Sequence, residues 1–436
     1  MSEVIKAFGC NGIWWLPENP SERVAGTLCF SDDDGIDLSL AGVFGEPAPG
    51  IAEKYVPIIL GLVWDYPLGK LVTLKGCRVH RFHLGSPGIG REVYFADRLF
   101  VGSHIEREED FSFSHLSVSL SGLSDWAGVL TGLSQQFIPV GKEGRKKFEI
   151  RWQSPEPIRG RIPGGDLALG VEGKVSLSRR EGSIKEKVWF SISCDNPHTE
   201  DELLARYAYP LQNFMTLATD HPNAQVEVTV RRPGEDDRIH VIAARVFHDA
   251  KAAEDLMPHK MLFSLEDVKD RAVALISRWM EVSERFAGVV NPYFGIQYEP
   301  KSFVDTKFLI VFQSLEVYSR LHTQGGGSIV TPSDQSLGHL FTKLLEEHWK
   351  TVGPLFGLSL EGTVAELMKY RNYVVHRDSD IGKEPDYSRK LYWLTQKLMF
   401  LMKACLLTEL GFTSDELDRF FRRNQMFVHI LNMVEK

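Results

Sequence analysis

Three residues near the end of the sequence could act together on a phosphate ester: Arg371, Asn372 and His376. A histidine side chain ordinarily has a pKa of about 6.5, so it can take up or release a proton near neutral pH. An arginine offers a planar, permanently charged fork for phosphate oxygens, and an asparagine amide can orient either group by hydrogen bonding. These residue types could transfer protons and stabilise an anionic transition state without a metal ion.

The spacing of these three residues leaves their geometry open. On a helix, Asn372 and His376 are four residues apart and share one face, whereas Arg371 lies roughly 140° from His376. Three arrangements would bring the guanidinium to the imidazole. The Arg371 side chain bends round, the helix frays at 373–375, or the site is assembled from two chains.

The elements around this trio have the period of helices. Ser264 and Asp267 stand at capping-box spacing at the start of this region. The pattern predicts an all-α unit over residues 264–436. Its predicted helices cover 264–286, 303–321, 334–349, 363–373, 387–410 and 414–432.

The sequence before residue 264 has the pattern of strands and turns. In the segment 111–120, apolar and small polar residues alternate with a period of two, so one face of this strand should belong to the core. After a break near residue 196, Thr199 and Glu202 resemble a capping box that opens a helix through about Ala218. We therefore expect an α+β multidomain protein, with a β-rich region over 1–263. Predicted strands cover 55–64, 70–82, 91–101, 111–120, 147–152, 187–194, 225–231 and 238–246.

Composition sets limits on partners and location. The net charge of -8 opposes binding to nucleic acid, but residues 264–436 carry 21 basic and 22 acidic residues, so the acidity is mostly N-terminal. The five cysteines are scattered singly, which favours neither a disulfide framework nor a structural zinc site. No apolar run approaches the roughly 20 residues of a membrane helix, and the start lacks the features of a signal peptide. We expect a cytoplasmic protein with no metal, cofactor or membrane partner.

The stretch Leu367-Met-Lys-Tyr-Arg371-Asn372-Tyr-Val-Val-His376 resembles the signature of the HEPN superfamily. The preceding segment Phe308-Leu-Ile-Val-Phe-Gln313-Ser-Leu-Glu316 looks like the helix before the motif in ApeA-like HEPN domains. Further upstream, segments 59–62, 71–77 and 116–126 are similar to the β-rich domain at the start of ApeA-like proteins. Together the resemblance covers nearly the whole chain.

This resemblance implies an anti-phage defence protein of the abortive-infection kind, with a C-terminal HEPN helical bundle. Arg371, Asn372 and His376 would be the catalytic residues of a metal-independent endoribonuclease. RNA carries its own nucleophile, the 2′-hydroxyl, so its cleavage would give a 2′,3′-cyclic phosphate and a 5′-hydroxyl. A tRNA substrate is suggested by analogy with other HEPN toxins. The resemblance also implies two motifs that meet across a two-fold homodimer or higher homo-oligomer, and an N-terminal region that senses a phage-derived trigger.

Other residues have weaker claims to a role. Arg377, Arg422 and Arg423 could contact the RNA backbone, although cations at the end of a helix also interact favourably with its dipole. Gln313 and Glu316 lie on an apolar helix, where a structural hydrogen bond to the motif helix is favoured over catalysis. The alternative function is a non-catalytic HEPN module that binds a nucleotide or a partner protein.

Overall fold

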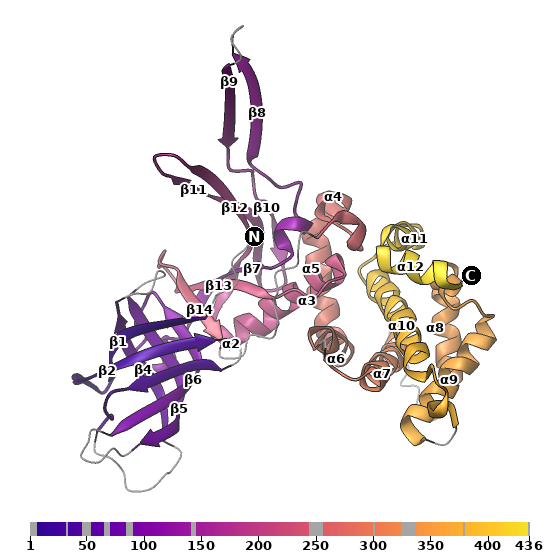
Figure 1. Ribbon diagram of the computed structural model, residues 1–436, viewed down its shortest axis with the longest axis horizontal. Helices are drawn as coiled ribbons and strands as arrows, with labels where there is room; N and C mark the ends of the chain where they lie inside the picture. The colour runs from indigo at the N-terminus through magenta and orange to yellow at the C-terminus, as the bar shows by residue number, and fades with distance from the viewer. Residues whose placement is uncertain are drawn as a thin grey trace. The chain divides into compact units, whose positions relative to one another are not determined.

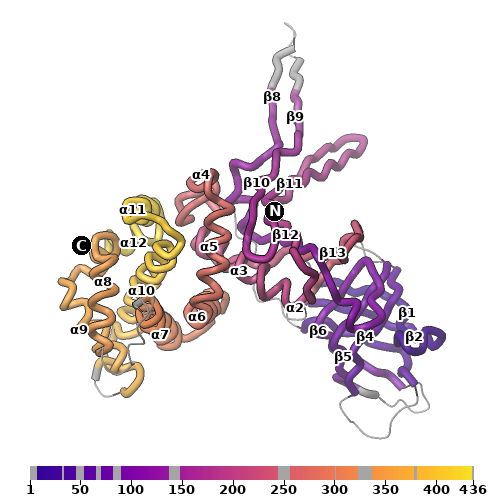
Figure 2. Tube along the Cα trace, turned by 180° about the vertical axis from the view of Figure 1, so that it is seen from behind, coloured from indigo at the N-terminus to yellow at the C-terminus, as the bar shows by residue number. Residues whose placement is uncertain are grey.

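The computed structural model describes residues 7–31, 34–45, 54–64, 70–83, 90–140, 145–243, 256–299, 301–323, 336–377 and 380–434. Contacts divide the chain into two units, the first made of residues 1–212 and 223–254, the second of 213–222 and 255–436. The first unit is built mainly from strands and the second from helices (Figures 1 and 2). The fold class predicted from the sequence is therefore confirmed.

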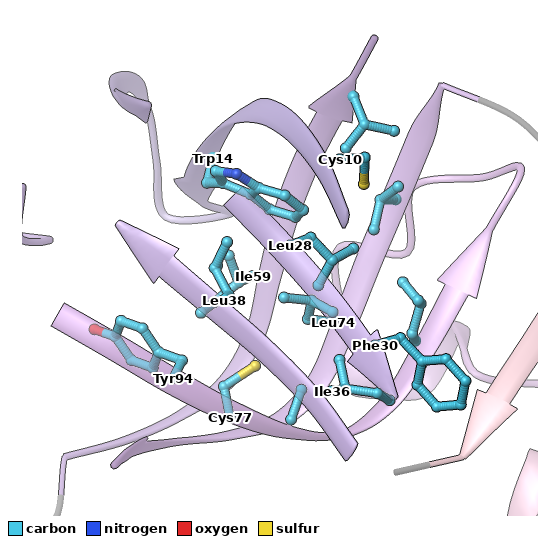
Figure 3. Close-up of a cluster of buried hydrophobic side chains, with 14 of the residues drawn as sticks. Cys10, Trp14, Leu28, Phe30, Ile36, Leu38, Ile59, Leu74, Cys77 and Tyr94 are labelled. Atoms are coloured by element: carbon cyan, nitrogen blue, oxygen red, sulfur yellow. The ribbon is translucent and has the colours of Figure 1, made fainter. Parts of the chain in front are cut away.

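The first unit contains a closed barrel. Its strands follow the order β6-β3-β2-β1-β4-β5, and β5 pairs back onto β6. Large apolar side chains fill the interior, including Trp14, Leu38, Leu74 and Tyr94, all of which are fully buried (Figure 3). Closure leaves no open sheet edge in the barrel. The strands are β1 (Phe8–Leu16), β2 (Asn19–Ser31), β3 (Gly35–Leu40), β4 (Tyr55–Val63), β5 (Leu71–His83) and β6 (Arg91–Val101).

The sheet continues beyond the barrel in the order β10-β11-β12-β7-β13-β14, and β14 pairs with β6. The period-two pattern of β7 is confirmed, because Leu116, Val118 and Leu120 are all buried on one face. A separate hairpin of β8 (Leu133–Val140) and β9 (Arg145–Trp152) projects from this sheet (Figure 1). The other strands are β7 (Phe113–Leu120), β10 (Ile158–Ile162), β11 (Gly165–Leu177), β12 (Gly182–His198), β13 (Gln225–Arg231) and β14 (Ile239–Ala243).

Short helices accompany the strands of the first unit. The predicted capping box is present at α2, where Thr199 accepts a hydrogen bond from the backbone N–H of Glu202 and the Glu202 carboxylate accepts one from the backbone N–H of Thr199. A π-helical turn at Leu204–Ala208 then leads into α3, whose residues belong partly to each unit. These helices are α1 (Leu123–Trp126), α2 (Glu200–Leu203) and α3 (Tyr209–Thr219).

The second unit packs its helices around an aromatic core. Phe263 contacts Phe412 and Phe420, with ring centroids 5.2 and 5.9 Å away, and Trp279 packs against Phe294. These rings bury a large apolar area that stabilises the bundle. The helices are α4 (Leu265–Val268), α5 (Ala272–Arg285), α6 (Ala287–Tyr298), α7 (Val304–Thr323), α8 (Leu337–Val352), α9 (Leu360–His376), α10 (Tyr387–Glu409), α11 (Ser414–Arg423) and α12 (Gln425–Val434).

The predicted helices differ from the structure most clearly in three places, and the motif helix α9 is three residues longer at each end than predicted. The Ser264–Asp267 capping box is present, but a 3₁₀ turn at Lys269–Arg271 splits the predicted long helix into α4 and α5. Helix α6 was not predicted, and it contains Pro292. The predicted helix 414–432 is divided at Asn424 into α11 and α12. The predicted positions 244–246 and 334–335 lie outside the described residues.

Within the described ranges, none of the helices is both long enough and apolar enough to cross a membrane.

Candidate functional site

Helix α9 carries the three candidate catalytic residues and is regular to its end. Ser359 caps the N-terminus by accepting a hydrogen bond from the backbone N–H of Gly362. At the other end, Arg377 adopts a left-handed conformation with φ of 55°, and its N–H donates to the carbonyl of Tyr373 over 2.8 Å. The helix therefore extends through His376, and the frayed arrangement that the sequence left open does not occur.

The side chain of Arg371 bends round the helix toward the imidazole. Its Nη1 lies 3.2 Å from Oδ1 of Asn372 and 3.5 Å from Nε2 of His376. Asn372 and His376 are exposed, whereas Arg371 is half-buried. The long, flexible arginine stem thus overcomes the angular separation of the two residues on the helix. One helix end consequently presents a guanidinium, an amide and an imidazole to solvent.

The contact between Arg371 and His376 constrains the imidazole tautomer. Because Nη1 is always a hydrogen-bond donor, the contact requires a lone pair on Nε2 of His376. The ring proton of a neutral imidazole would then be on Nδ1. In this state Nε2 can accept a proton, while the guanidinium beside it can bind an anionic oxygen.

Arg377 is held by an aspartate from another helix and by a tyrosine of its own helix. Its Nη2 lies 3.1 Å from Oδ2 of Asp305 on α7, and its guanidinium lies 5.0 Å from the ring centroid of Tyr373. The other oxygen of Asp305 accepts a 2.6 Å hydrogen bond from the hydroxyl of Tyr387 on α10. Hydrogen bonding to Asp305 raises the pKa of Arg377 further above its usual value. Asp305 thus already engages this guanidinium, and the predicted contact of Arg377 with the substrate stays a prediction.

Asp305 and Tyr387 were not identified from the sequence. Asp305 is 72 residues from Arg377, and at the start of a helix an acidic residue is explained by the dipole alone. Close packing completes the cluster, because a Cβ at Gly382 would lie 1.6 Å from the Tyr373 hydroxyl oxygen. Only long-range contacts reveal that Asp305 and Tyr387 help to fix Arg377, the residue directly after His376.

We expected Gln313 and Glu316 to form a hydrogen bond with the motif helix. Among the described residues, neither side chain does so. The Glu316 carboxylate accepts hydrogen bonds of 2.9 and 3.2 Å from Arg320, four residues later on the same helix. Gln313 is exposed. The apolar face of α7 instead buries neighbouring residues such as Phe312 and Leu315, so the two polar residues lie away from the core.

Arg422 and Arg423 are both engaged inside their own unit. Arg422 pairs with Asp418 one helical turn earlier, at 2.8 Å. Arg423 donates to both carboxylate oxygens of Asp267, at 2.7 and 3.1 Å, and to the carbonyl of Leu262. The expectation that this pair contacts RNA is therefore not supported for Arg423, whose guanidinium links α11 to the capped start of α4.

This arrangement predicts that Arg423→Ala lowers the free energy of unfolding by about 2 kcal/mol, because a half-buried carboxylate loses its charged partner. Burial tends to raise the pKa of Asp267, but Arg423 and the backbone N–H of Ser264 outweigh it and hold the pKa below its ordinary value of 3.8. The ion pair between Arg423 and Asp267 therefore stabilises the fold fully at pH values above 3.8. This stabilisation is lost as the pH falls through the lower pKa that Asp267 has in the folded state.

Urea unfolding of the wild type, Arg423→Ala and Arg422→Ala tests this expectation. The neighbouring Arg422 is the matched control, because its side chain is 57% exposed and its ion pair should contribute little. The difference between wild type and Arg423→Ala should narrow at pH values below about 4. Equal stability of the two variants at neutral pH would contradict the structural role of Arg423.

A groove of about 210 Å³ lies beside the motif helix within the second unit. Tyr370 of α9 and Trp393 of α10 line it, together with Lys390 and Lys397. Burial lowers the pKa of Lys397, with the nearby Glu366 acting in the opposite direction. The groove thus offers aromatic surfaces and ammonium groups next to the helix that carries Arg371. The described part of the chain contains no cluster of three or more His, Cys, Asp or Glu residues that could hold a metal ion.

Comparison with known proteins identifies the family. A family model described as ApeA N-terminal domain 1 matches residues 9–279, more than half of the chain, and a second model, Apea-like HEPN, matches residues 309–416. The chain belongs to the ApeA-like HEPN family. Comparison with curated proteins and with solved structures gave no match. The match to the HEPN model contains Arg371, Asn372 and His376, so the helix described above lies within the HEPN part of this ApeA-like protein.

The two matched domains indicate the general role of this ApeA-like protein. HEPN domains are generally ribonucleases, which supports a nuclease in general terms. The combination of an ApeA N-terminal domain with a HEPN domain is that of an anti-phage defence protein. The reaction itself depends on what the residues of α9 can do.

Proposed function

We propose that this ApeA-like HEPN protein is a metal-independent endoribonuclease that acts in abortive-infection defence. One observation supports the proposal above all. The Arg371 guanidinium lies within 3.5 Å of Nε2 of His376 and 3.2 Å of the Asn372 amide oxygen, at an exposed helix end. This arrangement combines a proton acceptor with a permanent cation, two of the three functions that RNA cleavage without a metal requires; the third is a proton donor for the leaving oxygen.

The proposed reaction begins with the 2′-hydroxyl of a ribose. Nε2 of His376 removes its proton, and the resulting oxygen attacks the adjacent phosphorus. Arg371 stabilises the negative charge that accumulates on the non-bridging oxygens, and Asn372 orients the guanidinium. The 5′-oxygen leaves as its bond to phosphorus breaks, and it takes a proton from a general acid, the protonated imidazole of His376 in a second copy of the chain. The products are a 2′,3′-cyclic phosphate and a 5′-hydroxyl.

A homodimer or higher homo-oligomer would supply both the acid and the base. In a two-fold arrangement two copies of α9 would face one another, so that one His376 removes a proton while the other donates one. The complete Arg371, Asn372 and His376 trio within one chain means that each copy would bring its own guanidinium. A strictly monomeric protein that retains full activity would rule out this part of the proposal.

The substrate is an RNA, with tRNA as one candidate by analogy. The groove beside α9 supports an RNA partner, because the half-buried Trp393 could stack on a base while Lys397 faces a phosphate. The β-rich unit would respond to a phage-derived trigger, and cytoplasmic RNA would be the target. If the protein only binds a nucleotide or a partner protein, no RNA is cleaved under any condition.

Incubation of the purified protein with total RNA and excess EDTA tests the proposed reaction. We expect cleavage to persist in the chelator, since every proposed step uses only side chains. Fragments should carry 2′,3′-cyclic phosphates, detected because the 3′ ends resist labelling by ligation until the cyclic phosphate is removed. Phage lysate is added in a parallel reaction to relieve inhibition by the β-rich unit. Cleavage that requires a divalent ion would contradict the mechanism.

The cluster around Arg377 predicts a positioning effect of Asp305. The substitution Asp305→Asn keeps the side-chain shape and the hydrogen bond from Tyr387, but it removes the negative charge that holds Arg377. Small displacements of catalytic groups are costly, so we expect kcat for RNA cleavage to fall about tenfold with little change in KM. Asp418→Asn, which alters the exposed ion pair with Arg422, is the matched control. Equal kcat values for the two variants would rule out this role of Asp305.

A further inference from the structure

The outer surface of the barrel carries a hollow of about 480 Å³, a volume within the range of small-ligand pockets. Strands β4, β5 and β6 form its floor, and the first turn of α2 contributes Glu200 and Asp201. Gly76 helps to make the hollow, because it adopts φ of 68° and a Cβ there would lie 2.4 Å from a carboxylate oxygen of Asp97. All of these residues belong to the first unit.

Two buried polar atoms of this hollow have no hydrogen-bond partner among the described residues: Oε2 of Glu200 and Nε of Arg98. Glu200 is only 1% exposed, and its other carboxylate oxygen pairs with Lys75. A buried charged group that lacks part of its hydrogen bonding is costly, so its persistence calls for an explanation. Here one atom can accept and the other can donate, and both residues line the same hollow.

The charges of the hollow indicate the kind of molecule that would fit. Each of its three cations already faces one carboxylate. Arg78 lies 2.9 Å from Asp97, Arg98 lies 2.9 Å from Asp201, and Lys75 pairs with Glu200. The formal charge of the lining is therefore zero, and no excess of cations is present to neutralise a polyanion such as RNA.

We propose that this hollow binds an uncharged peptide segment of a partner protein. A peptide group offers an N–H for Glu200 and a carbonyl oxygen for Arg98, which are the two functions that the hollow lacks. Tyr55, which is 56% exposed, and the half-buried Phe95 provide apolar surfaces for a neighbouring side chain. The segment binds through these side chains and not as an added strand, because β5 is already paired with β4 and β6 on its two sides.

Selection from a displayed library of random nine-residue peptides on the full-length protein tests the proposal. Recovered peptides are synthesised, and their affinities are measured by fluorescence polarisation. We expect Glu200→Gln and Arg98→Lys each to weaken binding about tenfold or more, because each removes one hydrogen bond that involves a charged group. Arg98→Lys keeps the cation opposite Asp201 while removing the Nε donor.

Two further variants separate binding from folding. Tyr55→Ala alters only an exposed wall of the hollow, so the protein should remain folded while peptide affinity decreases. Glu18→Gln makes the same chemical change as Glu200→Gln at an exposed position of the barrel and should leave affinity unchanged. The proposal is overturned if no peptide is enriched, if all variants bind equally, or if AMP or GMP binds in a Glu200-dependent way. These readouts do not involve RNA cleavage, so they stand apart from the proposed ribonuclease activity.

Discussion

Replacing His376 by alanine is expected to reduce the rate of RNA cleavage by about a thousandfold. The imidazole is the only side chain of the α9 trio with a nitrogen lone pair that can accept the proton of a ribose hydroxyl. Its Nε2 lies 3.5 Å from the guanidinium that would bind the attacked phosphate. Loss of the imidazole therefore removes proton transfer but leaves phosphate binding in place, so KM should change much less than kcat.

Two variants make this result specific. His376→Gln keeps a polar group that can accept a hydrogen bond from Arg371 but cannot act as a general base, so it should be as inactive as His376→Ala. His339→Ala removes another exposed histidine of the same unit, at the start of α8, and should keep full activity. Single-turnover cleavage of a labelled RNA in EDTA provides the rates. If His376→Ala cleaves as fast as His339→Ala, the proposed mechanism is wrong.

The position of the trio on a helix could be predicted from the sequence, but its side-chain geometry could not. Helical spacing fixes the direction of each Cα–Cβ bond and separates Arg371 from His376 by a large angle. The distance of 3.5 Å between their nitrogens arises because the arginine stem is long enough to reach round the helix. Helical spacing predicts the positions of the backbone and of Cβ, but it does not predict where the terminal group of a long side chain such as Arg371 lies.

Local signals in the sequence were reliable where one segment determines its own structure. The capping boxes at Thr199 and Ser264 are both present, because each needs only residues three positions apart. Helix α6 shows the limit of such signals. Pro292 lacks a backbone N–H and usually breaks a helix, yet burial of Val289 and Phe294 keeps this segment helical.

Contacts between distant segments were beyond sequence reasoning. The barrel closes through the pairing of β5 with β6, and nothing in either strand specifies that closure. In the same way, Arg423 and Asp267 are 156 residues apart, so each was interpreted by itself as a surface charge or a helix cap. A single sequence predicts which residues are charged, whereas the fold decides which charges are neutralised. Assignments of substrate contacts to clustered arginines are weak for this reason.

A buried ion pair in the helical unit should have the largest effect on stability. Nζ of Lys403 on α10 lies 2.5 Å from Oδ1 of Asp220, and the two side chains are only 7% and 10% exposed. Asn424 donates to the other oxygen of Asp220 over 2.9 Å. Asp220 adopts φ of 53°, directly after α3, so the pair joins the end of that helix to α10 and to the residue between α11 and α12. Removal of one partner leaves a buried charge without its counter-ion.

We therefore expect Lys403→Met to lower the free energy of unfolding by about 3 to 5 kcal/mol. Methionine preserves the apolar stem beside Phe400, so the loss reports on the charge and not on packing. Lys350→Met is the matched control, because Lys350 and Asp415 are 74% and 90% exposed and their pair should contribute about 0.5 kcal/mol or less. Chemical unfolding followed by circular dichroism measures both changes.

The double variant Lys403→Met with Asp220→Asn distinguishes a stranded charge from a general defect. Asparagine tolerates the left-handed conformation at position 220 and carries no charge, so the double variant should recover much of the stability that Lys403→Met loses. An uncharged amide can still accept the hydrogen bond from Asn424. If the double variant is less stable than Lys403→Met alone, the cost does not arise from an unpaired carboxylate. The buried pair would then stabilise the fold through its hydrogen-bonding geometry.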